Sequence, residues 1–148
     1  MKPERPDTPS ELKVRALRYL VRRDHSRAEL ARKLAPYAAS TESLDAVLDE
    51  LHAKKQLSDE RYAEARANWL SRKYGAAKIR QDLKAHGVAA ALVDRVSSAG
   101  EVEKARAILA RKYRAPATTR EEKARRARFL QGRGFSFEVV QSLLRTED

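Results

Sequence analysis

The chain has 148 residues, about the length of one ordinary domain, and its apolar residues, 42% of the total, include many alanines, which favours closely packed helices. The net charge is +11, and cysteine is absent, which excludes disulfides and thiolate metal sites and fits a reducing compartment. Because no apolar stretch reaches 18 residues or resembles a signal peptide, we expect a cytoplasmic protein without a membrane-spanning helix.

The first third of the chain predicts three helices separated by short turns. Residues 8–11 (Thr-Pro-Ser-Glu) form a capping box with proline at the first helical position, so the first helix begins here. Ser26 caps a second helix, with Glu29 as its expected reciprocal partner, and Pro36 ends that helix. A third helix is expected over residues 41–52.

Six further helices are predicted in the rest of the chain, and no alternating strand pattern occurs. Glycines at 75, 87, 100 and 134 are the expected helix stops, since glycine adopts the left-handed conformation at little steric cost. The predicted helices span residues 58–74, 76–86, 89–99, 101–113, 119–132 and 137–145.

A pattern of helix, glycine, apolar residue and second helix occurs twice, 47 residues apart, and a weaker copy precedes it. Ile79, Leu83, Gly87, Val88, Leu92 and Val96 align with Arg126, Leu130, Gly134, Phe135, Val139 and Leu143, and with Leu30, Leu34, Leu44 and Leu48 of the weaker copy. Such a period indicates stacked helical units. We therefore predict an all-α fold of three tandem three-helix repeats in an elongated, curved array of either hand. After a flexible segment 1–9, the repeats would span residues 10–56, 57–100 and 101–148.

The positive charge is concentrated in three segments. Residues 13–33 carry eight basic and two acidic side chains, residues 61–84 carry seven and two, and residues 104–133 carry eleven and two. One such run usually marks a solvated surface, but an excess that recurs with the repeat favours an extended, negatively charged partner. The candidate residues for binding a protein partner or DNA are Arg72, Lys73, Lys78, Arg80, Lys84, Arg111, Lys112, Arg125, Arg126, Arg128 and Arg133.

Catalytic and metal-binding patterns are not found. The histidines at 25, 52 and 86 have no metal-ligand spacing with one another, and His86 fits a structural role at a helix end. The glycine pair at 132 and 134 ends a helix rather than opening one, so a phosphate-binding loop is not indicated. We expect a protein that is not an enzyme and that uses no cofactor.

Two aromatic residues allow more than one interpretation. Trp69 lies among basic residues and could stack on a nucleobase, but it shares a helix stripe with Tyr62 and Ala65, so we favour core packing. Phe129 lies away from Ala127 on its helix and either reaches a neighbouring repeat or is exposed to a partner.

Four motifs in order carry a resemblance to a known family. They are RDHSRAEL at 23–30 with KL at 33–34, LSDERYA at 57–63, YGAAKIRQDL at 74–83 with HGV at 86–88, and RFLQGRGF at 128–135. These motifs resemble those of the RecX regulatory proteins over residues 12–145. The chain departs from the repeat pattern in two places. Residues 35–40 lack a glycine, and Arg126 takes the apolar position of Ile79, so its helix packs less deeply or its side chain snorkels to the rim.

The resemblance implies three three-helix repeats and a non-enzymatic regulator in DNA repair, recombination and the SOS response. Such a protein would be a monomer that lies in the groove of the RecA recombinase filament and inhibits its ATPase, strand-exchange and coprotease activities, with possible contacts to single- or double-stranded DNA. The alternative is a stand-alone, non-sequence-specific DNA-binding module whose basic stripe contacts phosphates. The ordered motifs favour the regulator.

Overall fold

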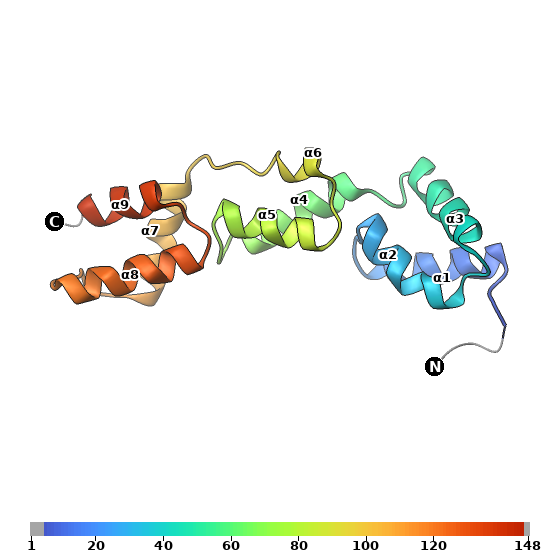
Figure 1. The fold of residues 1–148 in the computed structure, drawn as a ribbon, viewed down its shortest axis with the longest axis horizontal. Helices are drawn as coiled ribbons and strands as arrows, with labels where there is room; N and C mark the ends of the chain where they lie inside the picture. The colour runs from blue at the N-terminus through green and yellow to red at the C-terminus, as the bar shows by residue number, and fades with distance from the viewer. Residues whose placement is uncertain (1–4, 147–148) are drawn as a thin grey trace. The chain divides into compact units, whose positions relative to one another are not determined.

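The structure is a computed structural model that describes residues 5–146. All secondary structure assigned in that range is helical (Figure 1). The helices follow one another as three triplets, which confirms the predicted all-α class; the elongated, curved shape stays a prediction. They are α1 (Pro9–Arg22), α2 (Arg27–Leu34), the 3-10 turn η1 (Ala35–Tyr37), α3 (Thr41–Ala53), α4 (Asp59–Leu70), α5 (Ala76–Ala85), α6 (Ala90–Val93), α7 (Glu101–Lys112), α8 (Arg120–Gly132) and α9 (Phe137–Thr146).

Two compact units divide the chain. The first consists of the chain up to residue 65 together with residues 84–92, and the second consists of residues 66–83 and the chain from residue 93 onward. The first triplet (α1–α3) lies in the first unit and the third triplet (α7–α9) lies in the second. The second triplet (α4–α6) contributes to both, so each unit contains one joint between successive triplets.

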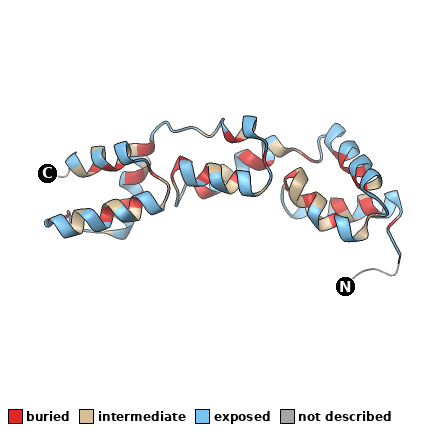
Figure 2. Ribbon diagram, viewed as in Figure 1, coloured by how far each residue is buried: buried red, intermediate tan, exposed pale blue. Residues whose placement is uncertain are grey.

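The first unit is built around leucine. Helices α1, α2 and α3 pack on one another because each carries an apolar stripe at helical spacing (Figure 2). At the start of α1, Thr8 and Glu11 form the predicted capping box, and Asp7 is buried with its carboxylate accepting from Arg15 at 2.8 Å. The end of the segment predicted to be flexible is therefore anchored; residues 1–4 lie outside the described range. The buried core consists of Leu12, Ala16, Leu30, Leu34, Leu44, Val47, Leu48, Leu51 and Leu57.

The second unit has its own core between α7, α8 and α9. Thr119 and Glu122 form a capping box at the start of α8, and the Ser136 hydroxyl accepts from the backbone N–H of Val139 at the start of α9. Both caps satisfy helix N–H groups that would otherwise lack a partner. The buried core consists of Ala105, Ile108, Leu109, Leu130, Phe135, Val140 and Leu143.

Two predicted helices are shorter in the structure. Helix α4 ends at Leu70 instead of Tyr74, and Gly75 donates its backbone N–H to the Arg133 carbonyl at 2.7 Å. Helix α6 spans only residues 90–93 of the predicted 89–99. After it, the Val96 N–H donates to the Val93 carbonyl and the Val96 carbonyl accepts from the Arg80 guanidinium at 2.8 Å. Each shortened helix is thus followed by a segment that is hydrogen-bonded to a distant part of the chain.

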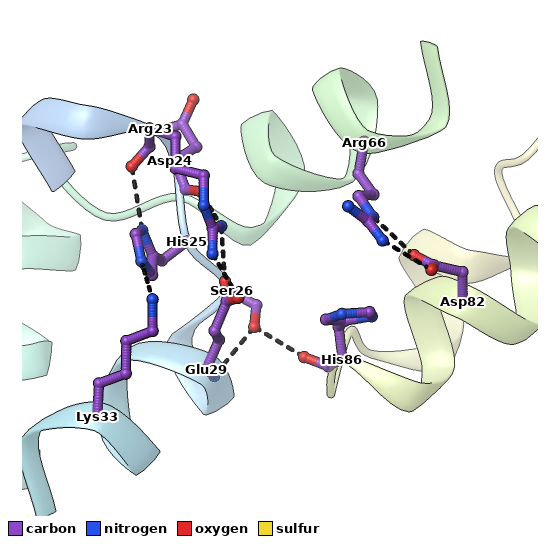
Figure 3. Close-up of polar contacts among 9 residues, drawn as sticks. All are labelled: Arg23, Asp24, His25, Ser26, Glu29, Lys33, Arg66, Asp82 and His86. Carbon is purple, nitrogen blue, oxygen red and sulfur yellow. Dashed lines mark hydrogen bonds and ion pairs between the residues drawn. The ribbon is translucent and has the colours of Figure 1, made fainter. Parts of the chain in front are cut away.

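The joint in the first unit sets the start of α2 against the turn between α5 and α6 (Figure 3). The Ser26 hydroxyl, which caps α2, donates to the His86 carbonyl at 2.7 Å, and the backbone N–H of Arg27 donates to the Asp59 carboxylate at 2.6 Å. The turn needs glycine because Gly87 has a φ of +80°. Glu29 was predicted to complete a capping box with Ser26. Its carboxylate instead accepts a hydrogen bond from the Arg23 guanidinium at 2.8 Å.

The joint in the second unit repeats this plan with other residues. The start of α5 lies against the turn between α8 and α9, where Gly134 has a φ of +93°. Here the Gly75 N–H makes the bond to the Arg133 carbonyl, and the backbone N–H of Ala76 donates to the Glu101 carboxylate at 2.5 Å. The two joints therefore share one cap. The acidic first residue of a triplet, Asp59 or Glu101, accepts from the start of the second helix of the triplet before it, α2 or α5.

Candidate partner-binding site

Basic side chains gather in the second unit because several of them hold its joint together. Arg111 donates to the Arg72 carbonyl, Arg133 donates to the Lys73 carbonyl at 3.2 Å, and Lys78 donates to the Gly132 carbonyl at 3.2 Å. These bonds place residues of α5, of α7 and of the turns after α4 and α8 beside one another. With Lys112, which follows Arg111 on α7, we name this group the cation cluster: Arg72, Lys73, Lys78, Arg111, Lys112 and Arg133.

Aromatic rings support the cation cluster. The Phe129 ring centroid lies 4.6 Å from the Lys112 ammonium and 4.9 Å from the Arg133 guanidinium, and Tyr74 lies 5.6 Å from the Lys78 ammonium. Such cation–π contacts orient a charged head group without neutralising it. Phe129 is half-buried, packs edge-on against Tyr113 and joins the core of its own triplet instead of a neighbouring repeat; exposure of its remaining surface to a partner stays a prediction.

A hollow of about 600 Å³ opens next to the cluster, between α4, α5 and the turn that joins them. Its volume falls in the range of pockets that hold small ligands or parts of larger ones. Three of its lining residues belong to the cation cluster. The lining consists of Arg66, Trp69, Leu70, Arg72, Lys73, Tyr74, Lys78, Gln81 and Asp82.

Trp69 is 63% exposed at this hollow, so the prediction that it packs in the core is wrong. The buried residues of α4 are Tyr62, Ala63 and Leu70. At about 100° per residue, the centre of that buried face lies about 80° from Trp69 around the helix. The indole therefore stands at the edge of the apolar stripe, where neighbouring helices do not cover it.

An ion pair beside Trp69 uses the one acidic residue of the hollow. Arg66 donates two hydrogen bonds to the Asp82 carboxylate, at 2.8 and 2.9 Å (Figure 3). The Arg66 guanidinium carbon lies 5.1 Å from the Trp69 ring centroid. By contrast, the side chains of Arg72 and Lys73 have no carboxylate partner among residues 5–146. The hollow thus combines an exposed indole with uncompensated positive charge.

Sequence reasoning missed Arg66 and Asp82. Arg66 and Trp69 are three residues apart on one helix, which is a local signal that they are neighbours. Asp82 lies 16 residues after Arg66 and on another helix. Only the packing of α4 on α5 therefore reveals that the two residues form a pair.

The other predicted residues are distributed differently. Arg126 is only 7% exposed, and its guanidinium donates to the Ala115 carbonyl at 2.6 Å, so its assignment to a partner-binding surface is corrected. Arg80 donates to the Ser98 hydroxyl at 2.9 Å as well as to the Val96 carbonyl. Lys84 is exposed in the first unit, and Arg125 and Arg128 are exposed on α8.

Within residues 5–146, no group of three or more His, Cys, Asp or Glu residues is arranged to hold a metal ion. In the same range, no helix is long and apolar enough to cross a membrane.

Comparison with known proteins gives consistent matches along the chain. Family models described as the first, second and third three-helix domains of RecX match residues 13–51, 58–96 and 100–144. Regulatory protein RecX of Herbaspirillum seropedicae is 40% identical over 144 residues, which cover 95% of this chain and 94% of the relative. That of Leptothrix cholodnii is 43% identical over 143 residues, covering 93% and 89%. The crystal structure of RecX from Lactobacillus salivarius has the same fold, with a TM-score of 0.82 at 20% identity over 95% of this chain and 96% of that one.

Proposed function

The chain belongs to the RecX family of regulatory proteins, and from this membership we propose that it binds the nucleoprotein filament of a RecA-type recombinase. In this proposal the protein inhibits the ATPase, strand-exchange and coprotease activities of the filament without catalysing a reaction itself. The predicted repeat boundaries and the docking residues are part of the proposal.

The cation cluster is the observation that carries this proposal. Six basic residues from two triplets meet in one unit, and the nearby Asp82 is occupied by Arg66. A surface of one charge sign attracts a partner of the opposite sign and speeds the encounter. The backbone of a nucleoprotein filament supplies negative charge along its length, so the cluster suits such a partner.

The test is DNA-dependent ATP hydrolysis by the cognate recombinase, measured at increasing concentrations of this protein. We expect a saturable decrease in hydrolysis. A double charge reversal, Arg72→Glu with Lys73→Glu, should require on the order of tenfold more protein for the same inhibition. Neither side chain makes a polar bond within residues 5–146, so the variant should fold normally.

A matched control reverses Arg18 and Arg22, which are exposed on α1 in the first unit. This variant has the same net charge as the Arg72/Lys73 variant but keeps the cation cluster, so it should inhibit like the unmodified protein. Hydrolysis that does not change at an excess of the unmodified protein would refute the inhibitory role.

The alternative, a DNA-binding module that needs no recombinase, is favoured by the exposed Trp69 in a basic hollow. Filament assembly in the presence of excess competitor DNA separates the two functions. A module that acts only through DNA loses its effect when competitor DNA binds it, whereas a filament regulator keeps its effect through contacts with the recombinase.

A further inference from the structure

We propose that the hollow at Trp69 is a binding site for single-stranded nucleic acid, in which a base stacks on the indole and neighbouring phosphates bind Arg72, Lys73 and Lys78. The inference deepens the proposed function and rests on it, because it takes a nucleoprotein filament as the partner. It adds a specific ligand, a single strand, and the residues that bind it.

The exposed indole is the first observation. Trp69 keeps 63% of its surface exposed although burial of so large an apolar group would stabilise the fold. Arg66, fixed by two hydrogen bonds from its guanidinium to Asp82, lies over the ring and limits its rotation. A ring that is held in place and exposed is a platform on which any of the four bases can stack.

The positions of the cations are the second observation. Arg72 and Lys73 follow Trp69 by three and four residues, and both line the same hollow. Lys78 lines it from α5, next to Tyr74. In a single strand, phosphates alternate with bases along the chain, so a site for it needs cations on the flanks of an aromatic platform. The hollow has this arrangement.

A peptide fits the hollow less well. An extended peptide would add to the edge of a sheet, and the structure has no strand between residues 5 and 146. An amphipathic helix needs a groove with apolar positions over two turns, but the apolar groups of this lining are limited to Trp69, Leu70 and Tyr74 and are surrounded by charges. Duplex DNA would also fit less well, because its bases are already stacked on each other.

The chain contains a single tryptophan, so its intrinsic fluorescence reports directly on the site. Full-length protein is titrated with a 20-nucleotide oligothymidylate, without recombinase, at low salt. We expect saturable quenching of the Trp69 emission. A duplex of the same length should quench little, because it offers no free base.

Variants are compared by the anisotropy of a labelled oligothymidylate, which does not need the tryptophan. Trp69→Ala should weaken binding roughly 5- to 150-fold, the effect of losing one stacked base. Trp69→Phe keeps an aromatic face and should recover much of the affinity. Phe137→Ala removes an aromatic residue of similar exposure, 60%, at the start of α9 and should bind like the unmodified protein.

Salt dependence tests the phosphate contacts separately. Replacing Arg72 and Lys73 by glutamine should make the slope of log affinity against log salt shallower by about 1.4, which is the expected value for two contacts to a single strand. An unchanged slope would overturn the assignment of these cations to phosphates.

The other outcomes are also decisive. The proposal would be overturned if Trp69→Ala and the unmodified protein bound the oligothymidylate with equal affinity. It would also be overturned if a polyglutamate peptide quenched the Trp69 emission and the oligonucleotide did not. That result would identify an acidic protein segment as the ligand. Because no recombinase is present, either result leaves the proposed function intact. Only the hydrolysis assay, repeated with Trp69→Ala, decides whether inhibition needs this hollow.

Discussion

The two joints between successive triplets share one backbone plan but differ in the side chains around it. In the first unit, the cap of α2 is a serine, and the Arg61 guanidinium beside it is paired with Asp24 at 2.8 Å. In the second unit, Gly75 takes the place of the serine, and Lys78, Arg111 and Arg133 donate to backbone carbonyls instead of carboxylates.

This difference leaves the two joints with different net charges. A carboxylate partner neutralises a guanidinium, whereas a carbonyl satisfies its hydrogen bond and leaves the net charge in place. The second joint therefore carries positive charge that the first one compensates. The repeat supplies the same geometry twice, and the proposed partner-binding surface lies at the second joint.

The largest expected effect comes from adding a methyl group to the glycine of each joint. In Gly134→Ala, the new Cβ would lie 2.5 Å from the Lys78 Cβ and 2.6 Å from its backbone nitrogen, at a φ of +93°. We expect a loss of about 2–5 kcal/mol in unfolding free energy, from backbone strain and overpacking together. Urea denaturation measures it. Gly100→Ala is the control, since its Cβ would meet nothing within 4 Å and only the strain of its positive φ remains.

The same substitution in the first joint can be rescued, which distinguishes the two joints. In Gly87→Ala, the new Cβ would collide with the Cβ of Ala28, while the Ala28 Cα is 3.8 Å away. A second change, Ala28→Gly, should therefore relieve the clash, and the double variant should be more stable than the sum of the single effects predicts. Additive losses would show that the turn itself, not the contact, limits this joint.

A smaller effect is expected from the two acidic caps. Glu101 is buried at 7% exposure and also lies 3.3 Å from the Lys104 ammonium, whereas Asp59 is half-buried. Glu101→Ala should cost about 1–3 kcal/mol, because it leaves the Ala76 N–H without its acceptor in a buried position. Asp59→Ala should cost less, about 0.5–2 kcal/mol.

Thermal or urea unfolding measures both losses, and Glu101→Gln is the control, since an amide oxygen can still accept the bond. A larger loss from Asp59→Ala than from Glu101→Ala would contradict the view that burial sets the strength of the cap.

The smallest effect is a dependence on pH that only the first joint should show. His25 is 2% exposed, with Nδ1 3.1 Å from the Arg23 carbonyl and Nε2 2.9 Å from the Lys33 ammonium (Figure 3). The ammonium donates to Nε2, so Nδ1 carries the proton of a neutral ring. Burial lowers the pKa of His25 below its ordinary value, and the charges of Arg23 and Lys33 lower it further, against the opposing bond to the carbonyl.

The unfolded chain therefore binds a proton more readily than the folded one. The stabilisation is fully present above the unfolded pKa of about 6.5 and is lost as the pH falls below it. Unfolding free energy measured at pH 7.5 and 5.5 should decrease more in the unmodified protein than in His25→Gln. His52→Gln, an exposed site on α3, should keep the full decrease; an equal pH response of the His25 variant would exclude this role.

Local signals in the sequence were sufficient for most helices. The capping box at Thr8 and the positive-φ glycines at 87 and 134 depend on residues next to one another, and the structure has them where they were predicted. The 47-residue register, together with the ordered motifs, predicted the triplets before any contact was known. Helices α4 and α6 were overestimated, and the segments that follow them make hydrogen bonds with distant residues through Gly75 and Val96.

The sequence by itself determined the all-α class, the order of the helices and the excess of positive charge, because helical periodicity, caps and composition are local properties of the chain. Only the tertiary structure decided what each charge does. Arg126 is buried against a carbonyl, Arg66 is paired with Asp82, and Arg72 is left beside an exposed Trp69. All three arginines look alike in sequence, and the partners of Arg126 and Arg66 lie 11 and 16 residues away, so tertiary packing decides them.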